Sequence, residues 1–235
     1  PAARRMCQHV TGGHTQHAQP SDLWEWAVDE KRTKQWIKAL GTIHWVVCGF
    51  SCQDMSVAHR KGQGLKGDRS SVYFAAYQLL QWTTDVYAEV DFTFECTVFK
   101  HKHPRDWDFV AHHLGASPQL LEAGWVSPAW RHRAFWSSFT FLQLEKREAP
   151  PESILGPGRR PTWRWRDKLP TITAAGPASW NHKACIQSPS EGAVVEGPLR
   201  ISEVERAMGF AAGSTDSGTH TERQRWKCLG NAIHA

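Results

Sequence analysis

The sequence predicts an α/β fold, a mostly parallel sheet with helices on both faces. Three observations support this prediction. Segments with strand patterns alternate with segments of helical spacing through the first 149 residues, an order typical of a parallel sheet. The chain has 235 residues, 40% of them hydrophobic and 22% charged, which is a globular composition with enough length to bury a sizeable core. Proline and glycine gather after Ala149 and indicate a linker into a smaller lobe.

The predicted strands are short apolar runs or segments that alternate with period two. Val90, Phe92 and Phe94, for example, alternate with polar residues, as in a half-buried strand. The predicted strands span residues 42–47, 88–94, 120–126 and 134–141.

The predicted helices carry apolar residues at helical spacing and have recognisable ends. Pro104 stands at a helix start and Gly115 follows its end. Ser202 and Glu205 have capping-box spacing, and Gly230 is expected to stop the last helix. The predicted helices span residues 21–40, 71–82, 104–114, 202–209 and 221–229.

The expected lobe, residues 150–198, is basic and rich in tryptophan. Residues 156–183 contain six basic side chains against Asp167 alone, with Trp163, Trp165 and Trp180 between them. The whole chain carries a net charge of +5, which favours an anionic partner such as nucleic acid. A solvated basic face is the alternative interpretation.

Other classes of protein are disfavoured by what the sequence lacks. No apolar run reaches the roughly 18 residues that span a bilayer, and no secretory signal opens the chain. The six cysteines and 13 histidines show no metal-ligand spacing, so no metal site is expected. Reduced thiols favour an intracellular protein, cytoplasmic in a prokaryote or virus and nuclear in a eukaryote.

A cysteine on a tight turn is the most informative local feature. The segment VCGFSCQDMS, residues 47–56, places Cys52 directly after an apolar run, where open α/β sheets position their ligand sites. A lone cysteine is usually inert packing. Here, however, a glycine-rich basic loop follows, made of Gly62, Gly64, Gly67, Arg69 and Ser70.

These residues resemble the cytosine-C5 DNA methyltransferases. Residues 49–56 are similar to the family's fourth motif, G-[GF]-x-C-Q-D-x-S, with Cys52 at the nucleophile position. Further likenesses follow in the family's order over about residues 47–233, and are closest to the animal de novo branch and related bacterial or viral enzymes. They are FECT (94–97), RHRAFW (131–136), LRISEVERAMGF (199–210) and LGNAI (229–233).

The resemblance implies a class I S-adenosylmethionine-dependent methyltransferase with a Rossmann-like sheet. Residues 1–149 would form the catalytic domain, 150–198 a target-recognition lobe, and 199–235 a return to the catalytic domain. Cys52 would attack carbon-6 of a flipped cytosine. Glu95 would act at N3, Arg133 at O2, and Arg131 would orient the glutamate. These groups match the charge that thiolate addition builds on the ring.

The resemblance also implies contacts with the cofactor and with double-stranded DNA. Basic residues of the glycine loop would hold phosphates, and those of the lobe would lie in the target-recognition region; a homo- or hetero-oligomer is a further expectation. The implied cofactor residues are Asp29, Ser51, Val72, Asn231 and Ile233. The implied DNA-binding residues are Arg60, Lys61, Lys66, Arg69, Arg159, Arg160, Arg164 and Arg166.

Departures from the family leave alternatives open. Cys96 replaces the usual asparagine after the glutamate, Thr97 the usual valine, and Ser51 the usual proline. No phenylalanine- and glycine-rich first motif precedes Ser21, so we expect a fragment of a longer product with weakened cofactor binding, or else a diverged protein that never had the motif. A non-catalytic homologue that binds DNA or a partner is one alternative function. The tRNA-methylating branch is another, although its Cys-Phe-Thr signature is absent.

Overall fold

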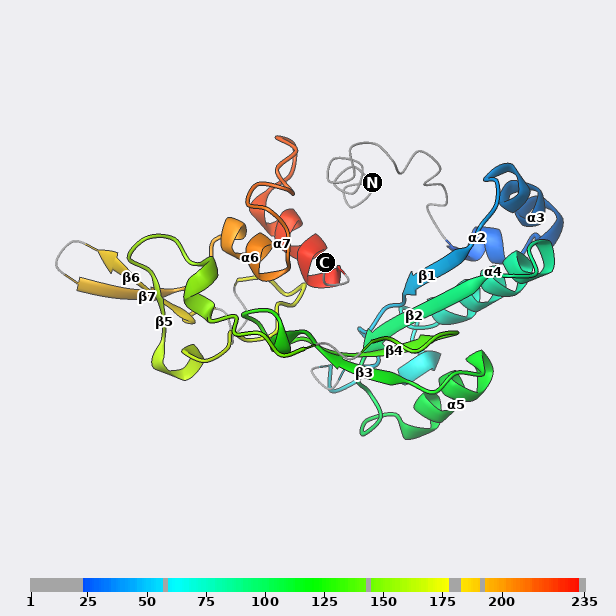
Figure 1. Cartoon of the computed structure of the whole chain (residues 1–235), viewed down its shortest axis with the longest axis horizontal. Helices are drawn as coiled ribbons and strands as arrows, with labels where there is room; N and C mark the ends of the chain where they lie inside the picture. The colour runs from blue at the N-terminus through cyan, green and yellow to red at the C-terminus, as the bar shows by residue number, and fades with distance from the viewer. Residues whose placement is uncertain (1–22, 57–58, 143–144, 178–182, 191–192, 233–235) are drawn as a thin grey trace. The chain divides into compact units, whose positions relative to one another are not determined.

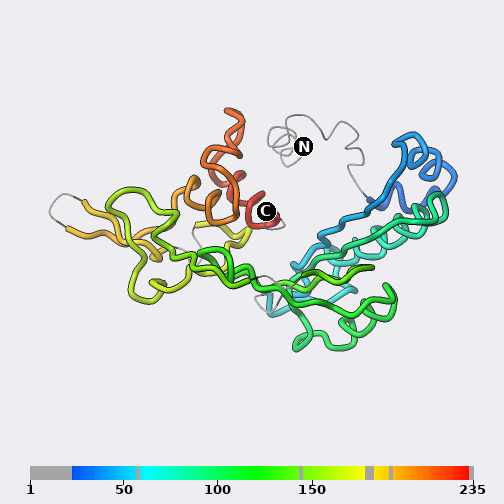
Figure 2. Tube along the Cα trace, viewed as in Figure 1, coloured from blue at the N-terminus to red at the C-terminus, as the bar shows by residue number. Residues whose placement is uncertain are grey.

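The computed structural model describes residues 23–56, 59–142, 145–177, 183–190 and 193–232. They form two compact units (Figure 1). The first unit comprises residues 23–121 and 132–142, and the second comprises 122–131 and the described residues from 145 onward. The chain therefore passes from the first unit into the second at residue 122 and returns to the first unit at residue 132. It passes into the second unit again after residue 142, a path that Figure 2 traces.

A four-stranded sheet is the framework of the first unit, with the order β1-β2-β4-β3. β1 is parallel to β2, whereas β2 is antiparallel to β4. The predicted α/β class is confirmed, and the sheet is mixed rather than mostly parallel. The strands are β1 (Trp45–Gly49), β2 (Asp91–Thr97), β3 (Gln119–Glu122) and β4 (His132–Ser137).

Strand ends differ from the predicted ones because pairing partners, rather than local patterns, set them. β1 and β2 both begin three residues later than predicted, where Trp45 pairs with Asp91. Residues 123–125 leave the predicted third strand for a 3₁₀ turn. β4 begins at His132, which brings Arg133 into the sheet.

The predicted helix 21–40 is divided in two. α2 spans Leu23–Ala27 and α3 spans Glu30–Ala39. Asp29 separates them, since its carboxylate accepts a hydrogen bond from the Arg32 N–H at 3.0 Å and caps α3. An N-cap carboxylate satisfies backbone donors that a helix start leaves unpaired.

Two longer helices pack beside the sheet residues. α4 spans Val72–Val86 and α5 spans Pro104–Leu114. α5 has the predicted ends, with proline in its first turn and Gly115 in the left-handed region at φ +62°, a conformation that glycine adopts without strain. α4 continues four residues beyond its predicted end.

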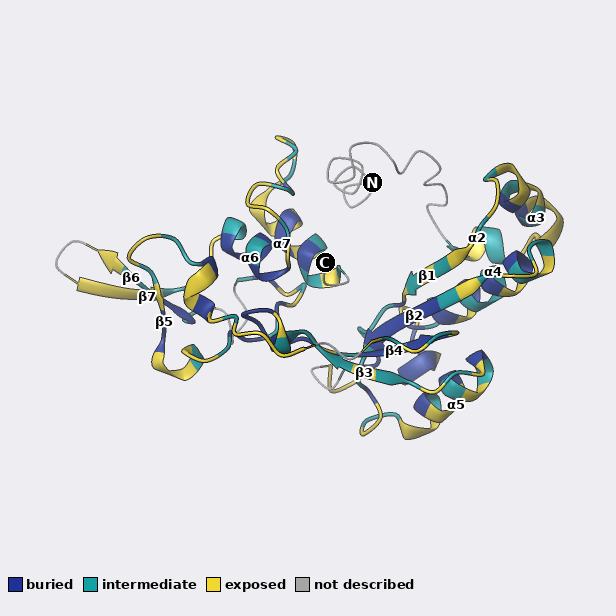
Figure 3. Cartoon of the chain, viewed as in Figure 1, coloured by how far each residue is buried: buried dark blue, intermediate teal, exposed yellow. Residues whose placement is uncertain are grey.

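The core of the first unit is largely aromatic. Tyr73 from α4, Phe94 from β2, Trp136 from β4 and Phe99 are fully buried, and Figure 3 shows the buried centres of β2 and β4. The Trp107 and Trp136 rings meet edge to face at 5.0 Å. Each such buried side chain contributes about 1.5–3 kcal/mol, so this core fixes the strands that carry the candidate site.

The second unit contains a small antiparallel sheet and two helices. The sheet has the order β5-β6-β7, and all its pairs are antiparallel. The elements are β5 (Arg160–Pro161), β6 (Ile186–Ser190), β7 (Ala193–Gly197), α6 (Ile201–Ala207) and α7 (Glu222–Asn231). Short 3₁₀ turns occur at η1 (Gly64–Lys66) in the first unit and at η2 (Ala123–Trp125), η3 (Pro151–Ile154) and η4 (Trp163–Trp165) in the second.

One hydrophobic core joins the lobe to the C-terminal helices. Leu169 and Ile186 pack in the same cluster as Val204, Trp226 and Leu229. The structure therefore places residues 199–232 in one unit with the lobe, whereas the predicted division assigned 199–235 to the catalytic domain.

The ends of α6 and α7 correct two predictions. α6 begins at Ile201 with Arg200 as N-cap, so Ser202 lies inside the helix. The Glu203 carboxylate, rather than that of Glu205, accepts the Arg200 N–H at 2.7 Å. α7 continues through Gly230, where an added Cβ would lie 2.3 Å from the Ala174 nitrogen; close approach to the backbone requires this glycine, not a helix stop.

Glu205 instead organises a buried polar network. Its carboxylate accepts hydrogen bonds from the Thr215 N–H at 2.8 Å and the Arg225 guanidinium at 3.0 Å. Burial alone would raise the pKa of Glu205, but hydrogen bonds from Thr215, Gly213 and Arg225 outweigh it and lower the pKa. The network ties α6 to α7 and to the loop between them.

None of the helices among the described residues is both long enough and apolar enough to cross a membrane.

We predict that Glu205→Gln destabilises the protein by about 3 kcal/mol, because it removes the buried carboxylate that pairs with the Arg225 guanidinium and leaves it the exposed Asp216 at 3.5 Å. A lowered carboxyl pKa contributes stability above the unfolded value and loses it as pH falls. The loss should therefore be full at about pH 7 and shrink below about pH 4.5. Urea unfolding at several pH values measures this, with the exposed Glu196→Gln as control. An equal loss at neutral and acid pH would contradict the ion-pair account.

Candidate active site

Cys52 lies on the turn that follows β1. Gly49 pairs with Glu95 across the parallel strands, and the Phe50 N–H extends this pairing with a 3.2 Å hydrogen bond to the Glu95 carbonyl. The Cys52 carbonyl then accepts hydrogen bonds from the Met55 and Ser56 N–H groups at 3.1 and 2.7 Å. The turn leaves Cys52 half-buried at the carboxyl edge of the sheet.

Glu95 and Arg133 form an ion pair beside this turn. In the antiparallel register Glu95 lies opposite Phe135 and Thr97 lies opposite Arg133. Glu95 and Arg133 are therefore diagonal neighbours on one face, within reach of long side chains. Arg133 Nε is 2.8 Å from Glu95 Oε1, and the side chains are 14% and 10% exposed. The pair is thus shielded yet still accessible.

Strand pairing places the Cys52 turn beside Glu95. Gly49 is the register partner of Glu95, and Cys52 follows three residues later. Arg133 is paired with Glu95. The structure therefore brings Cys52, Glu95 and Arg133 to the same edge of the sheet, and the catalytic roles that the resemblance implies for them stay a prediction. Burial is the main reason that the pKa of the Cys96 thiol is raised well above the usual value; Cys52 and Glu95 raise it further, and Arg133 lowers it.

Cys96 occupies the sheet face opposite Glu95. It is 1% exposed and packs in the aromatic core with Phe94 and Trp136. The backbone pairing of β2 and the ion pair with Arg133 therefore hold Glu95 in place. The resembling family has asparagine at the position of Cys96, and this chain lacks that polar side chain. Burial, followed by the charge of Glu95, raises the pKa of the nearby Cys48 to about 12.

The glycine-rich loop is folded tightly around Asp54. The Asp54 carboxylate accepts the Arg69 N–H at 3.2 Å, and the Asp54 carbonyl accepts the Gly64 N–H at 3.2 Å. A Cβ added at Gly67 would lie 2.4 Å from the Asp54 carboxylate. Only glycine permits this approach, which explains the loop's composition.

Two side chains around α5 brace the same segment. The Lys102 ammonium donates to the carbonyls of Ser56 and His59 at 2.8 and 2.5 Å. The Asp106 carboxylate accepts the Leu65 N–H at 2.9 Å. Sequence reasoning missed Lys102 and Asp106, because an isolated charge near a helix start gives no sign of a distant backbone partner.

The basic side chains of the loop remain available to solvent. Arg60, Lys61, Lys66 and Arg69 are all exposed. The Arg69 guanidinium also donates to the Gln53 side chain, one residue beyond Cys52. Their contact with phosphates stays a prediction.

Arg131 belongs to the second unit. It is 4% exposed, and its guanidinium donates to the carbonyls of Ile172, at 3.2 Å, and Ala232. Its own N–H donates to the Glu122 carboxylate at 2.7 Å. Arg131 thus anchors the 122–131 segment, and its predicted role in orienting Glu95 stays a prediction.

The predicted cofactor residues are only partly brought together. The Ser70 hydroxyl donates to the Ser51 carbonyl at 2.9 Å, which holds the start of α4, and with it Val72, beside the Cys52 turn. Asp29 caps α3, and its contact with an adenine stays a prediction. Asn231 ends α7 in the second unit, and Ile233 lies outside the described residues.

Ser51 and Val72 thus supply a polar backbone turn and an apolar helix start close to a strand end, and their contact with a cofactor stays a prediction. Groups of three or more potential metal ligands are absent from the described part of the chain.

The structure corrects the predicted DNA contact of Arg159. Its side chain is 8% exposed and paired with the buried Glu203, with Nε 2.8 Å from Oε1. Its other nitrogens donate to the Ser188 hydroxyl and the Pro198 carbonyl. A guanidinium committed to interior partners holds β6 to the start of α6 and does not reach a phosphate.

The other predicted lobe arginines are exposed. Arg160, Arg164 and Arg166 all lie on the surface. The Arg164 guanidinium lies 5.1 Å from the Trp165 ring centroid, and the neighbouring Trp163 is 82% exposed. These residues keep the predicted basic and aromatic character of the lobe surface.

Solved methyltransferase structures share this fold. The chain is similar to the Entamoeba histolytica methyltransferase EhMeth, with a TM-score of 0.62 and 13% identity over 92% of this chain and 78% of that one. It is also similar to a Spodoptera frugiperda DNMT2 variant, with a TM-score of 0.59 and 12% identity over 89% of this chain and 80% of that one. For the S. pombe Dnmt2 methyltransferase the TM-score is 0.50 and the identity 14%, over 89% of this chain and 78% of that one.

No protein-family profile and no curated protein sequence matches the chain. At these identities the structural likeness shows the fold alone. The chain therefore has the α/β fold of these methyltransferases, and its activity must be argued from the site.

We predict that iodoacetamide at about pH 8 modifies Cys52 well before Cys48 or Cys96. A thiol whose pKa is about 12 is ionised in roughly one molecule in ten thousand at that pH, and the thiolate is the reactive form. Peptide mass spectrometry after brief labelling gives the order. Labelling in urea, where all thiols should react, is the control. Equal labelling of Cys48 and Cys52 in the folded protein would contradict this assignment.

Proposed function

We propose that the protein is a DNA cytosine-C5 methyltransferase that uses S-adenosylmethionine. One observation carries the proposal: the turn with the half-buried Cys52 follows Gly49, the register partner of Glu95, and Glu95 is paired with Arg133 at the same edge of the sheet. These are the three groups that nucleophilic attack on a pyrimidine requires. The methyltransferase fold supports the same conclusion.

Cys52 supplies the nucleophile. Carbon-5 of cytosine is too weakly nucleophilic to take a methyl group unaided. When the Cys52 thiolate adds to carbon-6, the electron pair of the ring double bond moves toward carbon-5 and the N3–O2 edge. Carbon-5 then becomes an enamine carbon that can accept a methyl group. Removal of the carbon-5 proton expels the thiolate and restores the ring.

Glu95 and Arg133 stabilise the charge that this addition builds. The guanidinium carries five N–H donors; in the described structure Nε serves Glu95 and one Nη1 proton serves the His132 carbonyl. Arg133 can therefore hold Glu95 and still donate to O2. Proton donation to N3 requires Glu95 as the carboxylic acid, whereas the ion pair holds it as the carboxylate. Glu95 must therefore take up one proton from solvent before the base is bound, and pass that proton to N3 as Cys52 adds to carbon-6.

S-adenosylmethionine, when bound, supplies the methyl group. Ser51 and Val72 are the described residues at the Cys52 turn that would contact it. The exposed residues Arg60, Lys61, Lys66 and Arg69 would hold phosphates beside a double-stranded DNA site from which the base is flipped, at a cost of a few kcal/mol.

We predict that the protein forms a stable adduct with duplex DNA that carries 5-fluorocytosine, in the presence of the methyl donor. The fluorine blocks the last elimination step and traps the covalent species. Cys52→Ser should abolish the adduct, seen as a band shift in denaturing gels, and leave DNA affinity within about threefold. Cys228→Ser, at a half-buried thiol of the second unit, is the matched control.

An adduct that persists in Cys52→Ser would refute the nucleophile assignment. Wild-type protein that binds DNA in many sequence contexts without any adduct would favour the non-catalytic alternative. An adduct with 5-fluorocytosine RNA alone would move the activity to the tRNA-type reaction.

A separate prediction concerns the acid. Glu95→Gln keeps the size of the side chain and removes the acidic group that can transfer a proton to N3, so the single-turnover rate of adduct formation should fall by about 10²–10⁴. DNA affinity, measured by fluorescence anisotropy, should change little. Glu89→Gln, at an exposed position close to β2, controls for charge. A rate within about twofold of wild type would exclude Glu95 from the chemistry.

A further inference from the structure

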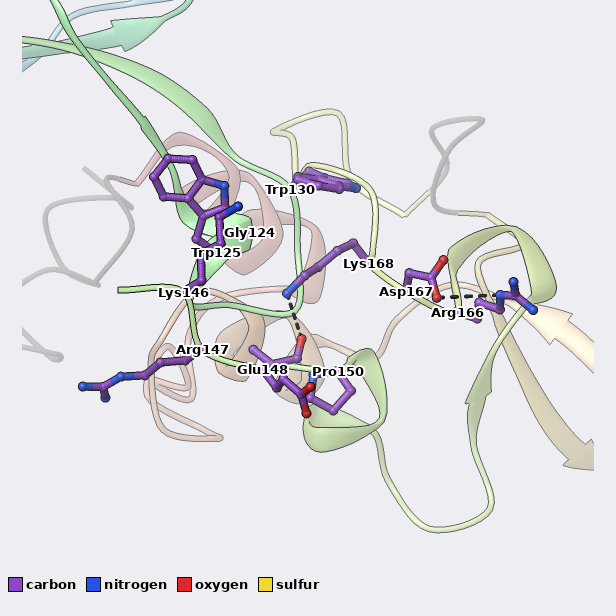
Figure 4. A pocket seen from close by; sticks show the side chains of 11 residues that line it. Gly124, Trp125, Trp130, Lys146, Arg147, Glu148, Pro150, Arg166, Asp167 and Lys168 are labelled. Atoms are coloured by element: carbon purple, nitrogen blue, oxygen red, sulfur yellow. Dashed lines mark hydrogen bonds and ion pairs between the residues drawn. The ribbon is translucent and has the colours of Figure 1, made fainter. Parts of the chain in front are cut away.

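The second unit contains a pocket that the proposed chemistry does not use. It is an open depression of about 540 Å³, within the roughly 300–1,000 Å³ that ligand sites occupy. Three segments line it, 124–130, 146–150 and 166–168. Figure 4 shows two tryptophan rings on one side and basic and acidic side chains around the rest. The lining includes Trp125, Trp130, Lys146, Pro150, Arg166 and Lys168.

Backbone hydrogen bonds join segment 124–130 to segment 146–150 and to Leu169, which follows segment 166–168. The Arg147 N–H donates to the Trp125 carbonyl at 2.9 Å. The Trp130 N–H donates to the Leu169 carbonyl at 3.0 Å, and the Leu169 N–H returns a bond to Pro128 at 2.8 Å. The pocket walls are therefore formed without a ligand.

Lys168 joins the segments from inside the pocket. Its ammonium donates to the carbonyls of Ser127 and Ala149, at 2.7 and 3.1 Å, and Figure 4 shows it between the tryptophans and Pro150. Lys168 is thus a structural cation, and the other basic residues of the lining, Lys146, Arg147 and Arg166, are exposed. Lys146 and Arg166 belong to the two segments that flank the tryptophans, and we take these two as the cations of the site. Arg166 is exposed, and its Nε is 3.7 Å from the exposed Asp167 carboxylate, a weak attachment that a ligand phosphate can replace.

The Trp130 ring is placed by Gly124. An added Cβ at Gly124 would lie 2.8 Å from Trp130 Cε3, so the ring rests directly against the glycine. Nevertheless Trp130 is 45% exposed. The second ring, Trp125, lies 5.3 Å from the Lys146 ammonium, a cation–π distance. The pocket therefore offers one open aromatic face and flanking positive charge.

This combination selects a flat ring attached to an anion. Aromatic faces with interleaved cations bind unpaired nucleotides, since each base has a face that stacks and each linkage carries a phosphate. A base within a duplex is already stacked on its neighbours and cannot insert. A purely apolar ligand would make no use of the exposed cations Lys146 and Arg166.

We propose that this pocket holds an unpaired nucleotide of the nucleic-acid substrate, with its base on Trp130 and its phosphate near Lys146 and Arg166. The identity of the ligand as nucleic acid rests on the proposed function. It follows that substrates with an unpaired base outside the target cytosine bind more tightly than fully paired ones.

The test compares three fluorescein-labelled probes with the full chain: a hairpin with an unpaired loop as RNA, the same hairpin as DNA, and a blunt duplex. Trp130→Ala should weaken hairpin binding about tenfold, a typical loss for one stacked base, and change duplex binding by less than about twofold. Trp130→Phe should restore most of the affinity, which excludes misfolding as the cause. Loss confined to the RNA or to the DNA hairpin supports the pocket and identifies the source of the nucleotide.

Trp163→Ala is the matched control, an 82% exposed tryptophan of the same unit that does not line the pocket. Equal hairpin binding by wild type and Trp130→Ala would overturn the proposal, as would equal losses for hairpin and duplex, or a loss in Trp163→Ala instead. A selective Trp130→Ala loss without any Cys52 adduct would keep the pocket and reject the catalytic proposal. A Cys52 adduct together with unchanged hairpin binding by Trp130→Ala would keep the catalytic proposal and reject the pocket.

Discussion

The parallel pairing of β1 with β2 is the constraint on which the candidate site depends. Because both strands end at the same edge, the turn after Gly49 and the last residues of β2 must meet there. The Phe50–Glu95 hydrogen bond carries this pairing one residue into the turn. β4 runs antiparallel and therefore begins where β2 ends, which delivers Arg133 to Glu95. Strand direction thus brings a thiol, a carboxylate and a guanidinium from three distant segments to one edge of the sheet.

The tightness of the Cys52 turn comes from side chains elsewhere in the first unit. The resembling family uses proline at position 51, which stiffens a turn by fixing φ. Here Ser51 is held through its carbonyl by Ser70, and the following residues are held by Asp54 and Lys102. Several modest hydrogen bonds, each worth about 0.5–1.5 kcal/mol, replace one covalent restriction. Cys96 is a second example. The resembling family has asparagine there to position the glutamate, whereas in this chain Cys96 packs in the core and the ion pair with Arg133 positions Glu95.

Strand and helix patterns predicted the α/β fold class, since backbone periodicity is written directly in the sequence. The grouping of Cys52, Glu95 and Arg133 was instead implied by the order of motifs that resemble the family. Partners distant in sequence were not predictable in the same way. Arg159 has the same local context as the exposed Arg160, and only the folded position of Glu203 separates a structural arginine from a surface one. The helix boundary at Gly230 failed for a related reason, since a close approach to the Ala174 backbone, rather than a helix stop, requires this glycine. The boundaries at Asp29 and Ile201 are instead local, because Asp29 caps α3 through the Arg32 N–H and Glu203 accepts the Arg200 N–H.

Arg131 and Arg133 are two residues apart in the sequence but have different structural surroundings. In an extended segment these side chains would project to the same side, and the resemblance gives them neighbouring roles. The chain instead passes from the second unit to the first between residues 131 and 132. Arg131 accordingly binds backbone carbonyls next to α7, and Arg133 binds Glu95 in the sheet. A guanidinium buried against carbonyls has no freedom to follow a substrate, whereas one that uses two of its five donors does. Of the two, Arg133 is therefore the arginine whose donors can respond to a base.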